Sequence, residues 1–189
     1  MKKLVIALGV SVLLGACAGS GMSNASNSAA TPMVGGAPMY PTKDIVDNAV
    51  NSKDHTTLVA AVKAADLVAT LKSPGPFTVF APTNASFAAL PAGTVDTLLK
   101  PENKATLTKV LTYHVVPGRM DSAALMSAIN AGGGKAMLKT ASGGTLTATM
   151  SAGTVWVTDA KGGTAAVTIA NVYQSNGVIH VVNKVLLPG

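Results

Sequence analysis

The first part of the chain alternates apolar and polar positions at a spacing that predicts short helices. One helix is expected to begin after Thr42 or Asp44, either of which can act as its N-cap. Its apolar positions are Ile45, Val46, Ala49 and Val50. A second helix is expected over residues 56–71, with six apolar residues mostly along one side: Leu58, Val59, Val62, Ala65, Leu67 and Leu71. Pro74 and Gly75 are expected to end it.

A strand and a polar corner follow in the stretch GPFTVFAPTNASF. The apolar run over residues 77–81 predicts a strand, and Pro82 ends it because proline has no N–H to donate to a neighbouring strand. Thr83 or Asn84 is then placed to cap a short helix. The alternative, a catalytic threonine, needs a base beside the hydroxyl, and the sequence shows no such pairing. We therefore interpret this corner as structural.

The rest of the chain changes from a helical pattern to a strand pattern. Residues 103–113 predict a helix whose inward positions are Leu107, Val110 and Leu111. Beyond residue 116, glycine-rich breaks separate short runs rich in Val and Thr. The runs expected to be strands cover residues 145–150, 155–158, 165–170 and 178–182. The pattern predicts one α+β domain in which antiparallel hairpins pack on the earlier helices.

The N-terminus has the pattern of an export signal. MKKLVIALGVSVLLGAC combines a basic start with an apolar stretch too short to span a bilayer. Its end, Leu14-Gly15-Ala16-Cys17, resembles the lipobox of bacterial lipoproteins, which implies a signal peptide over residues 1–16 and lipidation of Cys17. An ordinary secretory signal cut near Ala18 is the alternative. Ala18 also lacks the aspartate that retains enterobacterial lipoproteins at the inner membrane, which favours a lipid anchor in the outer membrane.

Residues 17–41 are rich in Gly, Ser, Ala and Pro and show no apolar period, so we expect a flexible tether there. Met22, Met33 and Met39 are too widely spaced to indicate a copper site. The folded domain is expected over residues 42–188.

Charge excludes one class of function. The formal charge of the 189-residue chain is +6, but Lys2 and Lys3 belong to the export signal and the remaining lysines are scattered singly. Nucleic-acid-binding domains gather such charges into a stripe. We therefore expect no nucleic-acid partner.

The three histidines give little support for a metal site or a catalytic base. His55 follows Asp54 ahead of a helix and is expected to be a solvated loop residue. His114 and His180 lie in apolar surroundings, which favours buried, neutral rings. Zinc needs three or four convergent ligands, whereas the chain has one Cys and one Glu, Glu102. We expect no metal, no cofactor and no enzymatic activity.

Three segments together resemble the signature motifs of the fasciclin-like domain. They are GPFTVFAPTNASF, then LTYHVVPG at residues 111–118, then SNGVIHVVNKVLLP at residues 175–188. The resemblance covers about residues 42–188. It implies a β-sandwich or wedge with a layer of packed helices, located outside the cytoplasm and associated with adhesion or matrix contacts.

The resemblance also implies roles for particular residues. Structural motif positions are Thr83, Asn84, His114, Asn176, Gly177 and His180. In animal members, segments around the Tyr-His pair and an Asp-Ile segment have been implicated in integrin binding. Here the latter reads Asn171-Val172, so its carboxylate is absent and integrin recognition is not transferred. The preferred contact patch in this chain is Tyr113, His114 and Arg119, with a solvated turn at Arg119 as the alternative.

Two functions follow as hypotheses. The first is a lipid-anchored interaction module of the cell envelope that contacts a protein or polysaccharide partner at the cell surface. The second is a carrier of an apolar small ligand, such as a carotenoid or a lipid, because some fasciclin-like proteins of algae bind carotenoids. The Ala, Val, Leu and Met content suits an apolar groove and an ordinary core equally.

Overall fold

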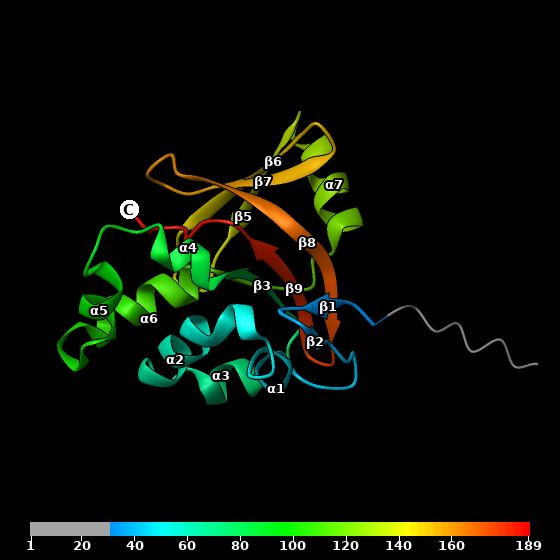
Figure 1. The fold of residues 1–189 in the computed structure, drawn as a ribbon. Helices are drawn as coiled ribbons and strands as arrows, with labels where there is room; N and C mark the ends of the chain where they lie inside the picture. Colours follow the sequence, from blue (N-terminus) through cyan, green and yellow to red (C-terminus); the bar gives the residue numbers. More distant parts are fainter. Residues whose placement is uncertain (1–30) are drawn as a thin grey trace, which may run out of the picture.

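The computed structural model describes residues 31–189 as one mixed α+β domain (Figure 1). The predicted signal peptide (1–16), Cys17 and the first part of the predicted tether lie outside the described residues. In the described part of the chain, seven α-helices accompany a seven-stranded sheet and a separate two-stranded ribbon. The predicted α+β fold class is confirmed.

Helices α1 (Ile45–Ala49), α2 (Thr56–Ala64) and α3 (Val68–Lys72) form a layer below the sheet in Figure 1. The prediction of one helix over residues 56–71 is wrong, because the chain breaks between α2 and α3. Asp66 adopts a left-handed backbone conformation with φ of 61° there, which no α-helix can continue.

Four more helices and two short 3₁₀ turns complete the helical part. They are α4 (Asn84–Ala88), α5 (Thr94–Leu99), α6 (Lys104–Tyr113), α7 (Ser122–Ala131), and the turns Lys53–His55 and Pro101–Asn103. The helix predicted over residues 103–113 is present as α6. Helices α5 and α7 were not predicted. In α7, small side chains surround two deeply buried positions, Leu125 and Ile129, so its apolar stripe is narrow.

The seven-stranded sheet has the order β4-β3-β9-β8-β7-β6-β5. The strands are β3 (Phe77–Pro82), β4 (Val115–Pro117), β5 (Lys135–Lys139), β6 (Thr145–Ser151), β7 (Thr154–Thr158), β8 (Thr164–Gln174) and β9 (Gly177–Val182). Neighbours run antiparallel except β3 and β9, which pair in parallel. The expected antiparallel hairpins are confirmed for β6 to β9. The parallel pairing of β3 with β9, whose strands come from distant parts of the sequence, was not predicted.

Strand β8 gives the sheet its wedge shape. Its pairing with β9 shifts register between Val167 and Ile169 and again between Ile169 and Val172, and Asn171 has a φ of 60°. Such bulges bend a strand and increase its twist. The β5–β7 half of the sheet therefore turns over the β3–β9 half (Figure 1).

Alternation along β3 and β9 divides the apolar interior into two clusters. Val79 and Ile179 face the helices α1–α3, whereas Phe80 and Val182 face the interior of the wedge. Helix α7 packs against β5 and β6 and closes that second cluster with Leu125. Because both of their faces are covered, β3 and β9 are almost continuously buried.

The predicted tether does not extend to residue 41. Strands β1 (Met33–Val34) and β2 (Ala37–Pro38) form a small ribbon, and Val34 and Met39 are buried in the helical cluster. The Gly35 carbonyl accepts a hydrogen bond from the Lys53 N–H. Two-residue strands have too few positions to show a period, so the sequence pattern gave no sign of the ribbon.

Among the helices of residues 31–189, none combines the length and the apolar character that crossing a membrane requires.

Candidate functional site

The polar corner after β3 is a helix cap. The Thr83 hydroxyl accepts a hydrogen bond from the Ser86 N–H (3.3 Å), and the Ser86 hydroxyl accepts one from the Thr83 N–H (3.2 Å). This reciprocal capping box satisfies two backbone donors at the start of α4. Asn84 accepts from the Thr57 N–H and donates to the Lys53 carbonyl, which ties α4 to the start of α2. Both side chains thus have structural roles.

The Tyr113-His114 pair is buried and cannot form a contact patch. Tyr113 is 1% exposed, and its hydroxyl donates to the Thr145 carbonyl (2.8 Å) and accepts from the Ala160 N–H (3.0 Å). His114 is 3% exposed. This burial corrects the expected patch of Tyr113, His114 and Arg119, because only Arg119 is exposed.

His114 holds the last segment of the chain in place. Its Nε2 accepts a hydrogen bond from the Leu186 N–H (2.9 Å), so Nδ1 carries the proton and donates to the Val110 carbonyl (2.8 Å). Burial lowers the pKa of His114 from 6.5 to about 4, so the ring is neutral at pH 7.

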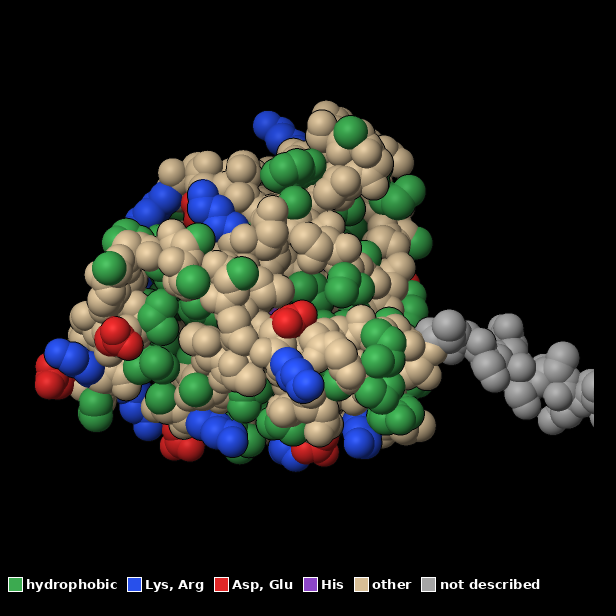
Figure 2. Space-filling model, in the orientation of Figure 1, with side chains coloured by type: hydrophobic (Ala, Val, Ile, Leu, Met, Phe, Trp, Pro, Cys, Tyr) green, Lys and Arg blue, Asp and Glu red, His purple; other side chains and the backbone are tan. Residues whose placement is uncertain are grey.

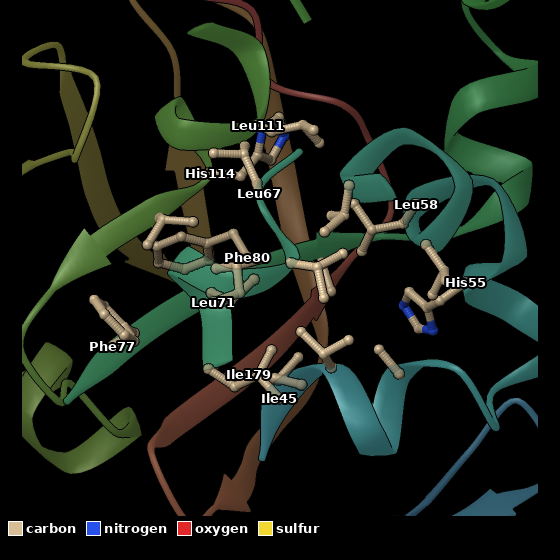
Figure 3. A pocket seen from close by; sticks show the side chains of 18 of the residues that line it. Ile45, His55, Leu58, Leu67, Leu71, Phe77, Phe80, Leu111, His114 and Ile179 are labelled. Atoms are coloured by element: carbon tan, nitrogen blue, oxygen red, sulfur yellow. The ribbon is translucent and has the colours of Figure 1, made fainter. Parts of the chain in front are cut away.

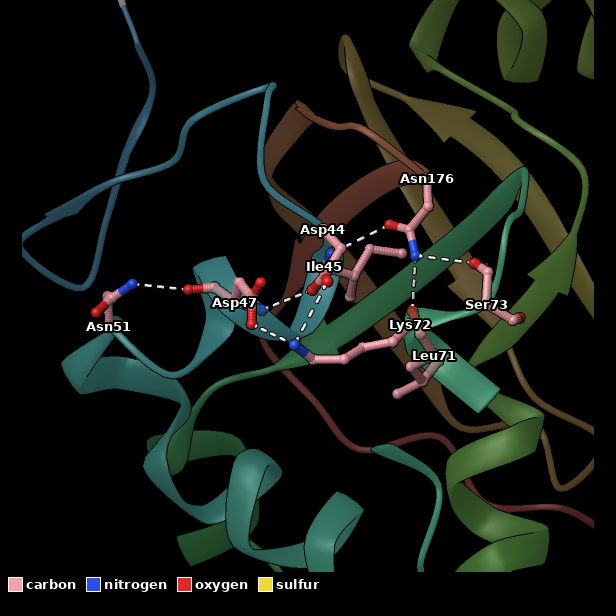
Figure 4. A network of polar contacts seen from close by, with 8 residues as sticks. All are labelled: Asp44, Ile45, Asp47, Asn51, Leu71, Lys72, Ser73 and Asn176. Carbon is pink, nitrogen blue, oxygen red and sulfur yellow. Dashed lines mark hydrogen bonds and ion pairs between the residues drawn. The ribbon is translucent and has the colours of Figure 1, made fainter. Parts of the chain in front are cut away.

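Asn176, in the turn between β8 and β9, connects two helices to the sheet (Figure 4). Its Oδ1 accepts from the Ile45 N–H (3.1 Å) at the start of α1, and its Nδ2 donates to the carbonyls of Leu71 (2.7 Å) and Ser73 (3.2 Å) at the end of α3. Beside it, Lys72 forms ion pairs with Asp44 and Asp47. The motif asparagine is therefore a structural link.

Gly177 permits the close approach of β9 to β3. A Cβ atom at this position would lie 2.1 Å from the Phe77 carbonyl oxygen, a separation that no side chain can adopt. The predicted structural role of this glycine thus has a steric reason.

The other two histidines are also buried. His180 is fully buried, bonds to the Met120 carbonyl through Nε2 (2.8 Å) and stacks on Phe80. His55 is 3% exposed, so the expectation of a solvated residue is wrong. It lies in the 3₁₀ turn ahead of α2, and its Nδ1 pairs with the Ser52 hydroxyl (2.8 Å). Burial lowers the pKa of both rings.

Arg119 belongs to a small surface cluster. Its guanidinium lies 4.8 Å from the centre of the Tyr173 ring, and the Tyr173 hydroxyl is 3.4 Å from Asp121. Asp121 caps the start of α7 by accepting a hydrogen bond from the Ala124 N–H. This hydrogen bond holds the pKa of the Asp121 carboxyl below its usual value. Because its guanidinium lies against the Tyr173 ring, Arg119 is already engaged within the domain.

The sheet exposes a second surface, which the sequence analysis missed. Along β5, β6 and β7 every second residue points away from the wedge interior, and the register aligns these positions across the three strands. We call this the outer sheet face. It consists of Lys135, Met137, Lys139, Thr145, Thr147, Thr149, Thr154, Trp156 and Thr158. The alternation of residues in those strands could have predicted one exposed side for each strand. The sequence did not show which strands lie next to one another.

Carboxylates are confined to other parts of the molecule. Beyond Asp121 the sequence contains a single acidic residue, Asp159, and four lysines. Asp159 is buried and accepts hydrogen bonds from the N–H groups of Gly163 and Leu187. In Figure 2 red and blue side chains alternate along the lower, helical edge, while the upper part over β6–β8 shows few charges. The outer sheet face therefore carries only positive charge, from Lys135 and Lys139.

An apolar cavity lies between the helical layer and the sheet (Figure 3). Its volume is about 100 Å³, and its walls come from α1, α2, α3, β3 and β9. Phe77 contributes aromatic surface, and His55 stands at the side away from Phe77 in Figure 3. No carboxylate lines it.

No cluster of three or more histidine, cysteine, aspartate or glutamate side chains that could hold a metal ion occurs within residues 31–189.

Comparisons with known proteins agree with this geometry. The sequence profile of the Fasciclin domain matches residues 53–188. The chain is 53% identical over 144 residues to Protein sll1483 of Synechocystis, covering 76% of this chain and 73% of that protein. It is 36% identical over 145 residues to Immunogenic protein MPB70 of Mycobacterium bovis, covering 74% and 66%. A solved FAS1 domain pair from the insect cell adhesion molecule Fasciclin I superposes with a TM-score of 0.69 at 16% identity, over 77% of this chain and 51% of that chain.

Proposed function

The chain belongs to the fasciclin-domain family, and from that premise we propose that it is a lipid-anchored, extracytoplasmic interaction module that binds an acidic macromolecule at the cell surface. Fasciclin domains are in general non-catalytic modules of adhesion and extracellular proteins. The solved structure with the same fold comes from a cell adhesion molecule. The finer role of this chain is our proposal.

The outer sheet face is the observation that carries the proposal. Trp156 on β7 is partly exposed, with Thr149 opposite on β6, and Met137 on the edge strand β5 is 75% exposed. Aromatic and methionine side chains are enriched in protein contact surfaces, and tryptophan is frequent among the residues that dominate binding energy. Threonine hydroxyls beside them can both donate and accept hydrogen bonds.

The charge of the outer sheet face indicates the sign of the charge on its partner. Lys135 and Lys139 flank Met137 on β5, and no acidic side chain belongs to the face. Exposed lysines on an edge strand also prevent pairing with another sheet, so they limit self-association through that edge. A partner rich in carboxylate, phosphate or sulfate groups would be attracted, and the attraction would weaken as salt is added.

Anchoring through Cys17 supports such weak contacts. Many copies tethered to one membrane act together, so modest single-site affinities add to firm attachment. The anchor and the outer-membrane location remain predictions from the sequence.

The carrier hypothesis receives little support in its original form. Sites for drug-sized ligands enclose roughly 300–1,000 Å³, whereas the cavity under the helices encloses about 100 Å³. A carotenoid or a lipid chain does not fit that space. We therefore favour the interaction module.

The proposal is tested by attachment of cells to an acidic polysaccharide surface. In a deletion strain, we expect complementation with the wild-type gene to restore attachment. The variants Trp156→Thr and Lys135→Ala/Lys139→Ala should reduce attachment by about tenfold or more, as expected when a residue that dominates the contact is lost.

The matched control is Lys53→Ala/Lys100→Ala, which removes two exposed lysines from the helical side and should retain attachment. Unchanged melting temperatures would show that each variant is folded. If the outer-face variants attach as well as the control does, the proposed contact surface is wrong.

A further inference from the structure

One line of side chains crosses the outer sheet face from strand to strand. Pairing places Lys135 on β5 opposite Thr149 on β6, and Thr149 opposite Trp156 on β7. Residues paired in this way share a face of the sheet, so the three side chains stand in line on its exposed side. Neighbouring strands lie about 4.8 Å apart, which separates the backbone positions of Lys135 and Trp156 by roughly 10 Å. We call this line the Trp156 row.

Trp156 supplies the aromatic surface of the row. It is the only tryptophan of the chain, and it is partly exposed. The next position across the sheet, on β8, is Ala166, whose methyl group is too small to cover an indole ring. The indole therefore presents apolar surface to solvent directly beside the polar side chain of Thr149.

We infer that the Trp156 row binds an acidic polysaccharide built of uronic acid units, with the sugar chain lying across the strands. This inference deepens the proposed function and rests on the same contact surface. Pyranose rings in an extended chain repeat at a distance close to the strand spacing of about 4.8 Å, so each ring lies over one strand. One ring stacks on Trp156, the hydroxyl groups of the next bond to Thr149, and the carboxylate of a third pairs with Lys135.

The side chains of the outer sheet face favour a sugar chain over an acidic protein. Sugar hydroxyl groups both donate and accept hydrogen bonds, as the hydroxyl groups of the threonines on this face do. Protein partners are held mainly by several aromatic and arginine side chains, whereas this face has one aromatic residue and no arginine. Its charge comes from Lys135 and Lys139 alone, so a carboxylate on each sugar ring is attracted.

Lys139 allows a matched comparison within the same strand. Like Lys135 it is exposed on β5, but it pairs with Thr145, outside the Trp156 row. Four residues of strand separate the two lysines by about 13 Å, which exceeds the screening length of about 8 Å at physiological salt. A ligand seated on the row therefore contacts Lys135 and not Lys139.

The test uses the fluorescence of Trp156, which reports on the row because the chain has no other tryptophan. The purified full chain is titrated at physiological salt with trigalacturonate, with its neutral methyl ester, and with a triglutamate peptide whose ends are blocked. We expect trigalacturonate to shift the emission. The methyl ester keeps the rings but loses the charge, and it should bind about tenfold more weakly. The peptide keeps the charge but has no rings, and it should leave the emission unchanged.

Two variants locate the bound carboxylate. Lys135→Ala should weaken the binding of trigalacturonate about tenfold, because a hydrogen bond to a charged group is lost. Lys139→Ala should change the affinity less than about twofold, because its charge is screened at that distance. Both lysines are exposed, and unchanged melting temperatures would show that both variants are folded.

The absence of an emission shift at roughly 10 mM trigalacturonate, where even weak complexes form, would overturn the row as a polysaccharide site. Equal losses in the two lysine variants would do the same. Equal binding of the triglutamate peptide would show that an acidic protein segment suffices. In each case the proposed function still stands if cell attachment depends on Trp156. Binding of trigalacturonate without any role of Trp156 in attachment would reject the proposed function alone.

Discussion

His114 is a hydrogen-bonding member of the core, and its burial makes the stability of the domain depend on pH. The folded protein disfavours the charged imidazolium and lowers the pKa to about 4. In the unfolded chain the pKa returns to about 6.5. Between these two values the unfolded state binds more protons than the folded state, so acid favours unfolding.

We predict that the free energy of unfolding is constant near pH 7 and falls as the pH drops from about 6.5 to about 4. The pKa shift of His114 accounts for a loss of about 3 kcal/mol over that window. His55 and His180 act in the same direction, because burial lowers their pKa values too. Urea unfolding at a series of pH values measures the slope.

The control is His114→Gln, whose side-chain amide can replace the ring's donor and acceptor but does not titrate. It should be less stable than wild type at pH 7 and show a shallower dependence on pH. Identical slopes for the two proteins would mean that folding does not lower the pKa of His114.

At the scale of elements, short helices depend on side chains that belong to distant parts of the chain. Helix α1 has five residues and α3 has five, too few to be stable alone. Asn176 satisfies a backbone donor at the start of α1 and two backbone acceptors at the end of α3. One side chain in the β8–β9 turn therefore fixes both helices against the sheet.

We predict that Asn176→Asp destabilises the domain by about 1–3 kcal/mol, because a carboxylate keeps the acceptor for Ile45 but loses the donors to Leu71 and Ser73. Amide hydrogen exchange in α1 and α3 should become faster while exchange in β6 and β7 stays unchanged.

Asn183→Asp is the matched control. Its side-chain oxygen accepts from the Ala166 N–H, which a carboxylate does equally well, so stability should be retained. Equal losses in both variants would show that added charge, and not the lost donors, destabilises the protein.

At the scale of the whole molecule, the predicted N-terminal modification decides where the domain acts. Cys17 is the only cysteine of the chain and follows the Leu14-Gly15-Ala16 sequence that resembles a lipobox. We predict that a lipid is attached to Cys17 and that residues 1–16 are removed. Cells fed an alkyne fatty acid should label the wild-type protein and not Cys17→Ser. Equal labelling of both would contradict the anchor.

The sequence by itself determined the local features of this protein. Pro82 and Thr83 predicted the end of β3 and the cap of α4, because these signals depend on neighbours in the chain. For the same reason, the Val- and Thr-rich runs over residues 145–150 and 155–158, separated by a glycine break, predicted two strands. The motif positions Asn176 and Gly177 were recognised by resemblance, without the contacts that explain them.

Only the tertiary structure decided which side chains are accessible and which meet. Tyr113 and His114 were included in the preferred contact patch and His55 was expected in a solvated loop, yet the folded structure buries all three. The parallel pairing of β3 with β9, the outer sheet face and the cavity beside His55 combine residues far apart in the sequence. Burial and pairing of this kind are properties of the assembled layers, and hydrophobic periodicity carries no information on which layers meet.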